Sequence, residues 1–130
     1  MILLDTHIWV WWVQGESRLD PAHRAALDAA SPERLALSAF SCWEVVKLHE
    51  HGRLTLPVDI SSWIGQATVY PRLDIIPLTT EIAIGVADLP PGMHKDPADQ
   101  IIVATARALN CPLLTYDRLI LKYPHVKIYT

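Results

Sequence analysis

The feature of this sequence that most constrains its fold is the alternation of short apolar runs with helix-like segments. Strand-like runs lie at residues 2–4, 34–40, 73–78 and 112–116, with a last one expected at 126–130. Helix-like segments lie at residues 6–13, 19–30, 41–52, 60–67, 79–89 and 97–109. Because right-handed crossovers place helices on both faces of a parallel sheet, this order predicts an α/β fold, a three-layer α/β/α sandwich with a mainly parallel sheet.

The length and composition predict a single domain over residues 1–130. The apolar content of 51% and the charged content of 19% exclude a disordered chain. No apolar run approaches the ~20 residues that a membrane-spanning helix needs. Asp5 interrupts the apolar start of the chain, no basic segment precedes it and no cleavage site follows it, so no signal peptide is predicted. We therefore expect a cytoplasmic protein with no membrane partner.

Charge and cysteine content narrow the function classes further. A net charge of −3 argues against a protein that grips nucleic acid by a broad basic surface. Bound divalent cations would reverse the sign of an acidic site, so nucleic acid is not excluded. Cys42 and Cys111 form no CxxC pair and have no histidine at zinc-finger spacing, and both are expected as buried thiols.

Two acids stand directly after strand-like runs. Asp5 follows residues 2–4, and Asp117 follows residues 112–116. In an open parallel sheet, binding sites form at the carboxyl ends of the strands, so both acids are expected at the same edge. Each also has an ordinary structural interpretation: Asp5 is a good helix N-cap, and Asp117 alone would be a turn residue.

A third acid, Glu44, lies on an apolar stripe. Phe40 and Leu48 stand four residues before and after it, at helical spacing, whereas a solvated glutamate would be expected on another face. The alternative is a surface ion pair with Lys47, three residues further on.

Asp96 and Asp99 stand at the start of the helix-like segment 97–109. Asp96 followed by Pro97 is typical of an N-cap, and capping is the favoured role for Asp96. Asp99 has apolar residues three, four and seven positions after it, which turn its helix face inward. The helix N-terminus also stabilises a charged carboxylate, the form that binds metal.

Four acids from separate segments, Asp5, Glu44, Asp99 and Asp117, would repel one another unless a cation lies among them. Few basic residues lie near them in sequence, so a divalent metal is expected. All-oxygen carboxylate sites suit Mg²⁺ or Mn²⁺, which also bind phosphate oxygens, and the natural reaction class is phosphodiester hydrolysis.

The histidines and tryptophans predict no rival site. His49 and His51 face different directions on a helix, and the other histidines lack HExxH-like neighbours, so no zinc site is predicted and all are interpreted as ordinary polar residues or RNA contacts. The cluster of Trp9, Trp11 and Trp12 is expected in the core or at a dimer interface, with base stacking as the alternative.

Four segments resemble, in order and spacing, the motifs of PIN-domain ribonucleases of the VapC toxin type. They are "LLDTHIWVWW", "SCWEVVKLHEHGRLTLP", "DPADQIIVATA" and "LLTYDRLI", which together span nearly the whole chain. The resemblance implies a PIN-like fold and an acidic catalytic and metal site formed by Asp5, Glu44, Asp99 and Asp117. It also implies supporting roles for Thr6, Asp96 and Thr115.

The resemblance implies an activity and partners as well. The expected activity is Mg²⁺- or Mn²⁺-dependent hydrolysis of RNA, and the expected partners are the RNA substrate, a VapB-like antitoxin and a second copy of the chain. One position departs from the family pattern: Gln100 stands where an arginine often follows the acid equivalent to Asp99. Any phosphate or partner contact made by that arginine is therefore in doubt.

Two other enzyme classes fail on spacing, and one non-enzymatic reading stays open. A haloacid-dehalogenase-type phosphatase needs a second aspartate where His7 stands, and a response-regulator receiver needs adjacent acids near the first strand. The remaining alternative is a catalytically inactive PIN-like module that binds RNA or protein. It would be favoured if the four acids were exposed and far apart.

Overall fold

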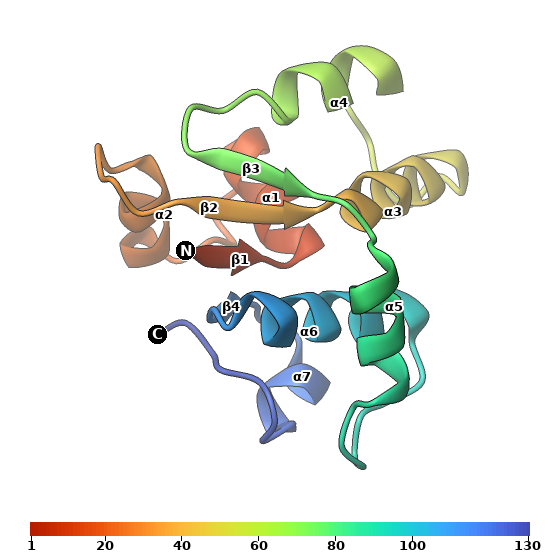
Figure 1. Cartoon of the computed structure of the whole chain (residues 1–130). Helices are drawn as coiled ribbons and strands as arrows, with labels where there is room; N and C mark the ends of the chain where they lie inside the picture. The colour runs from red at the N-terminus through yellow and green to blue at the C-terminus, as the bar shows by residue number, and fades with distance from the viewer.

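The computed structural model describes all 130 residues and contains one parallel sheet between helices (Figure 1). The strands, in spatial order, are β3 (Leu73–Ile76), β2 (Leu35–Ser38), β1 (Ile2–Leu4) and β4 (Leu113–Leu114). The helices are α1 (Thr6–Gln14), α2 (Pro21–Asp28), α3 (Ala39–Glu50), α4 (Ile60–Ala67), α5 (Thr80–Ala87), α6 (Pro97–Leu109) and α7 (Arg118–Lys122). Every strand pairing is parallel, which confirms the predicted α/β/α class.

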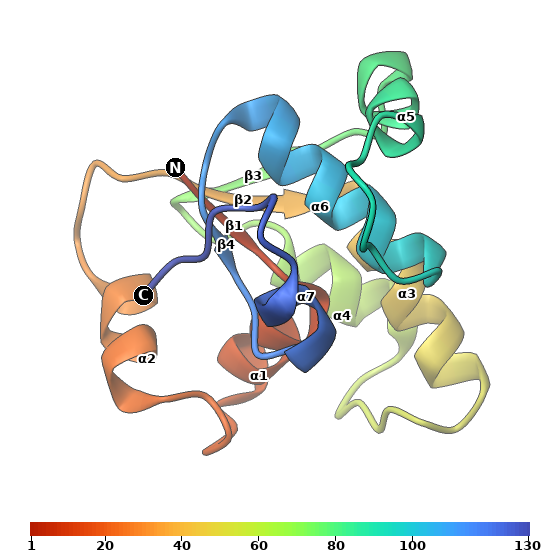
Figure 2. The same cartoon turned by 90° about the horizontal axis from the view of Figure 1, so that it is seen from below.

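The two faces of the sheet carry separate cores, because successive residues of a strand point to opposite faces. Leu4 belongs to the cluster that contains Trp9 of α1 and Trp63 of α4, whose rings meet edge to face with centroids 5.0 Å apart. Leu3 belongs to the second cluster, with Ile102 of α6. The view from below shows α6 on one side of β1 and α1 and α2 on the other (Figure 2).

Capping residues fix several helix ends as the sequence predicts. Asp96 accepts the backbone N–H of Ala98 at 2.9 Å, and Pro97 occupies the first turn of α6. Gly15 ends α1 in the left-handed region with φ of 67°, a conformation that glycine adopts without a Cβ clash. These local signals explain why α1 and α6 begin and end where they do.

The C-terminal part of the chain differs from the prediction. The strand expected at residues 126–130 is wrong, because only an isolated bridge joins Ile128 to Leu113. Its partner β4 is two residues long and therefore offers few backbone groups for a further strand. The helix α7 was not predicted; it begins immediately after Asp117, whose side chain caps it.

Two smaller expectations also needed correction. The helix α3 begins at Ala39 rather than residue 41, because the side chain of Ser38 accepts the backbone N–H of Phe40 and caps it. Cys111 is buried as expected, but Cys42 is only half-buried.

No helix is both long and apolar enough to cross a membrane.

Candidate functional site

The carboxyl edge of the sheet opens into a cleft of about 370 Å³. Five acids line it: Asp5, Glu44, Asp96, Asp99 and Asp117. They come from the end of β1, from α3, from the start of α6 and from the segment after β4. The expectation that acids distant in sequence meet at this edge is therefore confirmed in geometry, and none of the four principal acids lies far out in solvent.

Asp5 is the most buried of these acids, with only 3% of its surface exposed. Its Oδ1 accepts the backbone N–H of Thr6 at 2.8 Å, and its Oδ2 accepts the hydroxyl of Thr115 at 2.6 Å. Thr115 in turn accepts the backbone N–H of Asp117 at 3.0 Å. The two interpretations of Asp5, as a helix N-cap and as a candidate site residue, are compatible. The same carboxylate caps α1 and lines the cleft.

Glu44 is held by the hydroxyl of Thr6 at 2.5 Å, and that hydroxyl also lies 2.8 Å from the hydroxyl of Ser41. The pKa of Glu44 is raised to about 7, mainly by burial and in part by the nearby carboxylates, against the opposing effect of the Thr6 hydrogen bond. The alternative of an ion pair with Lys47 is wrong, since Lys47 lies 3.2 Å from Glu50.

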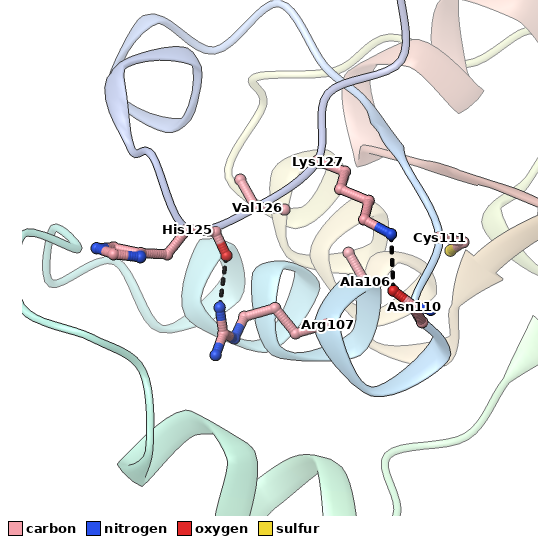
Figure 3. Close-up of a pocket in the computed structure, with 7 residues that line it drawn as sticks. All are labelled: Ala106, Arg107, Asn110, Cys111, His125, Val126 and Lys127. Atoms are coloured by element: carbon pink, nitrogen blue, oxygen red, sulfur yellow. Dashed lines mark hydrogen bonds between the residues drawn. The ribbon is translucent and has the colours of Figure 1, made fainter.

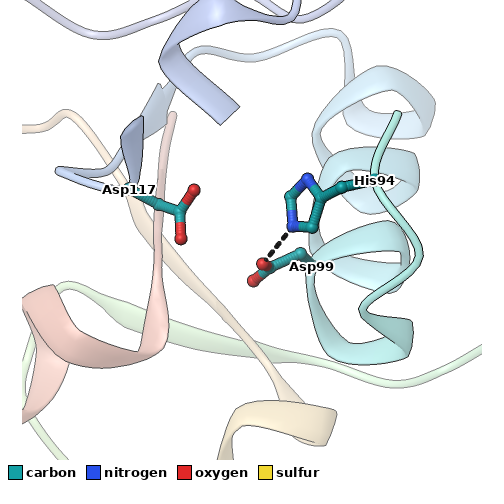
Figure 4. Close-up of side chains that lie close together, drawn as sticks. All are labelled: His94, Asp99 and Asp117. Atoms are coloured by element: carbon teal, nitrogen blue, oxygen red, sulfur yellow. Dashed lines mark hydrogen bonds and ion pairs between the residues drawn. The ribbon is translucent and has the colours of Figure 1, made fainter. Parts of the chain in front are cut away.

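Asp99 and Asp117 face each other across the cleft, and His94 completes a group of three (Figure 4). One ligand atom from each of the three residues lies within 4.8 Å of the other two. His94 Nε2 is 2.6 Å from Asp99 Oδ2. Burial raises the pKa of Asp99 to about 6, offset in part by the His94 hydrogen bond and reinforced by the other acids.

His94 is a site residue that the sequence analysis missed. It lies in the loop before α6, and its partner Asp99 lies inside that helix, so no helical or strand spacing links them. The sequence analysis gave His94 only as an ordinary polar residue or RNA contact, because no HExxH-like pattern surrounds it. The one available signal was its position two residues before the acidic N-terminus of α6.

Two of the acids also serve as caps. The exposed Asp96 accepts the backbone N–H groups of Ala98 and Asp99 at 2.9 and 3.3 Å, as its predicted role requires. Oδ1 of Asp117 accepts the backbone N–H groups of Leu119 and Ile120. Its other carboxylate oxygen, Oδ2, accepts no hydrogen bond within the chain. The interpretation of Asp117 as only a turn residue is therefore incomplete, because this acid caps α7 and also lines the cleft.

Aromatic and basic side chains complete the cleft wall. His7 Nε2 accepts the backbone N–H of Tyr116 at 2.9 Å, and burial lowers the pKa of His7. Trp11 is half-buried in the cleft, with the guanidinium of Arg18 4.7 Å from its ring centroid. Trp9 and Trp12 are in the core, as expected of that cluster.

The donor set fits a divalent cation. Carboxylate oxygens with one imidazole are ligands for Mg²⁺ or Mn²⁺, which prefer oxygen. Burial is the main cause of the raised pKa values of Glu44 and Asp99, and the neighbouring carboxylates add to it. The three-residue group His94, Asp99 and Asp117 could hold a metal ion, with Asp5 and Glu44 lining the same cleft.

A second hollow, of about 260 Å³, lies between the end of α6 and the C-terminal segment (Figure 3). Arg107 donates to the backbone carbonyl of His125 at 2.6 Å, and Lys127 donates to Asn110 Oδ1 at 2.8 Å. No acid lines this hollow, and both of its cations already have partners. It offers no reactive group that rivals the acidic cleft.

The chain is similar to known proteins both in sequence and in fold. Residues 2–126 match the family model described as PIN domain. The chain is 33% identical over 129 residues to Ribonuclease VapC22 of Mycobacterium tuberculosis, covering 99% of this chain and 96% of that protein. Two solved structures share the fold at lower identity.

The first of these structures is VapBC2 from Rickettsia felis bound to a DNA fragment from its promoter. It has a TM-score of 0.72 and 19% identity, and the match covers 99% of this chain and 98% of that one. The second is a toxin-antitoxin complex from Klebsiella pneumoniae, with a TM-score of 0.66 and 20% identity over 100% of this chain and 97% of that one.

Proposed function

Because this chain belongs to the PIN-domain family and is a homologue of the VapC-type ribonuclease toxins, we propose that it is a metal-dependent endoribonuclease. It hydrolyses RNA phosphodiester bonds as the toxin of a toxin-antitoxin pair. The observation that carries this proposal is the convergence of Asp5, Glu44, Asp99 and Asp117 on one cleft, where acids outnumber the arginines in the lining.

The four acids are proposed as the metal-holding and catalytic set, with His94 beside them. Mg²⁺ or Mn²⁺, when bound, supplies activation of water and neutralisation of the phosphate charge. Asp99, Asp117 and His94 each offer a ligand atom within 4.8 Å of the other two, and Asp117 uses only Oδ1 for its capping hydrogen bonds. Asp5 and Glu44 line the same cleft.

Two threonines position these acids. Thr115 donates to Asp5 and accepts from the backbone of Asp117, so one hydroxyl fixes two acids relative to each other. Thr6 contacts two acids through different groups, because its backbone N–H donates to Asp5 Oδ1 and its hydroxyl donates to Glu44. Such orientation keeps the carboxylates in place without further reorganisation when a cation enters.

The partners follow from the same family membership. Since a solved relative is a toxin-antitoxin complex, we propose that a VapB-like antitoxin binds this chain and occupies the cleft. A homodimer is proposed on the same ground. The rival function, an inactive PIN-like binding module, is disfavoured because it gives no reason for several buried or half-buried acids to share one cleft.

The test is an RNA cleavage assay with the purified chain in Mg²⁺, in Mn²⁺ and in EDTA. Single-stranded and structured RNA are both offered, and products are resolved on a denaturing gel. We expect cleavage with metal, none in EDTA, and none for Asp99→Asn. Asp88→Asn, which changes an exposed acid of another surface, is the matched control. RNA binding without cleavage under every metal would favour the inactive module instead.

A further inference from the structure

A third hollow adjoins the acidic cleft on the side of α3. Its volume is about 280 Å³, and it shares Glu44, Leu48, Arg53 and Asp96 with the cleft. Its outer wall is formed by other residues of α3 and the following turn. Because four lining residues are common to both, the hollow and the cleft are contiguous.

An exposed aromatic pair forms that outer wall. Trp43 is 51% exposed, whereas the other four tryptophans are buried or half-buried. Its ring lies against Phe40, with centroids 4.8 Å apart and an angle of 33° between the planes. The contact with Phe40 holds the Trp43 ring in place and leaves a planar apolar surface open beside the cleft.

Two cations, Lys47 and Arg53, lie beside this aromatic surface. Lys47 Nζ lies 5.8 Å from the centroid of the Trp43 ring and 3.2 Å from Glu50 Oε2. Arg53 stands where the hollow meets the cleft, and its guanidinium makes no hydrogen bond or ion pair within the chain. A free guanidinium beside five carboxylates is available to an anionic ligand that bridges the two spaces.

We propose that this hollow is a nucleotide subsite, in which an unpaired RNA base stacks on Trp43 and the adjoining phosphate contacts Arg53. Aromatic side chains stack on unpaired bases with little sequence preference, and nearby cations follow the phosphates. The inference rests on the proposed function in one respect, that RNA is the molecule in the cleft.

The subsite restricts the form of the substrate. A base that stacks on Trp43 is unpaired, so the nucleotide next to the cleaved bond comes from a single strand, a loop or a bulge. Duplex RNA cannot present a base to this surface without opening. The subsite therefore selects RNA by strandedness, while leaving base identity open.

The experiment measures binding by fluorescence anisotropy in the Asp99→Asn background with Mn²⁺, so that the RNA stays intact. The probes are a labelled single-stranded decaribonucleotide of mixed sequence and an abasic ribose-phosphate oligomer of equal length. Trp43→Ala should weaken binding of the first probe by about tenfold and leave the abasic probe unchanged. Trp43→Phe should restore most of the affinity.

Arg53→Gln should weaken both probes by a similar factor and flatten the salt dependence, because a phosphate contact does not depend on the base. Val69→Ala, at another exposed apolar side chain, is the control and should change neither. Thermal melting confirms that each variant is folded.

Three results would overturn the subsite. The first is an unchanged RNA affinity of Trp43→Ala, and the second is an equal loss of affinity of this variant for both probes. The third is a Trp43→Ala variant whose RNA affinity is unchanged but whose molecular mass in light scattering differs from that of the wild type. The last would make this surface a contact between two copies of the chain. Wild-type cleavage is scored separately. If the wild type cleaves RNA but Trp43→Ala does not change RNA affinity, only the subsite is rejected. If Trp43→Ala weakens RNA binding but the wild type cleaves no RNA, only the proposed catalysis is rejected.

Discussion

The hydroxyl of Thr115 donates to Oδ2 of Asp5 at 2.6 Å, although 110 positions separate the two residues. The other oxygen of Asp5 accepts the backbone N–H of Thr6, so both oxygens of this buried acid are held. Since Thr115 also accepts from the backbone of Asp117, the ends of β1 and β4 are joined through one side chain. The arrangement of the acids is thus part of the folded structure before any ligand binds.

Thr115→Val should therefore destabilise the chain and lower RNA cleavage together. The change leaves Asp5 Oδ2 and the backbone N–H of Asp117 without a partner, at a cost of about 1–3 kcal/mol for a buried polar group. Thr115→Ser, which keeps the hydroxyl, should recover both properties. Urea unfolding and a cleavage assay on the same samples measure this. Full activity in Thr115→Val would show that the hydroxyl does not position Asp5.

Asp99→Asn should abolish cleavage while the fold is kept, because the change preserves shape and removes one charged ligand. Asp96→Asn should retain most activity, since asparagine is itself a good N-cap for the backbone groups that Asp96 holds. The two acids stand three residues apart in one helix turn, so each is the control for the other. A loss in Asp96→Asn as deep as in Asp99→Asn would make Asp96 a ligand.

In EDTA, the free energy of unfolding should fall as the pH rises from about 4 to about 7. The pKa of Glu44 is about 7 in the native state against an ordinary value of 4.5, and that of Asp99 is about 6 against 3.8. The native state therefore binds more protons in this range, and stability present below the unfolded pKa is lost as the pH passes the folded one.

Glu44→Gln should flatten this pH dependence. At pH 7.5 the variant should be more stable than the wild type by roughly 1–2 kcal/mol, a value reduced because the open cleft lets solvent screen the acids. At pH 4 the two proteins should be equal. Glu81→Gln, at an exposed acid of α5, serves as the control. Urea unfolding at both pH values in EDTA gives the comparison, and parallel curves for wild type and Glu44→Gln would contradict it.

Saturating Mn²⁺ should stabilise the wild type, because the metal binds the native state and not the unfolded chain. At a hundredfold excess over the dissociation constant the gain is ~2.7 kcal/mol. Asp117→Asn and Asp5→Asn should gain much less, and Asp88→Asn should gain as much as the wild type. Thermal unfolding in EDTA and in Mn²⁺ measures each response. An undiminished gain in Asp5→Asn would leave Asp5 as a helix cap only.

Local sequence determined the elements and several of their ends. Short apolar runs alternating with helical periodicity specify a parallel sheet covered on both faces, since the connection between parallel strands has one hand. Asp5 after the first strand and Asp96 before Pro97 were predictable because a cap depends on a few neighbouring residues. The placement of acids at the carboxyl edge followed from topology alone.

Only the tertiary structure decided which side chains meet. His94 pairs with Asp99 across a loop, and Thr115 pairs with Asp5 across the sheet, and no periodicity links either pair. The isolated bridge at Ile128 and the short helix after Asp117 likewise depend on what the rest of the fold leaves available. Propensity acts over a few neighbouring residues, whereas packing and long-range hydrogen bonds join positions that the sequence keeps far apart.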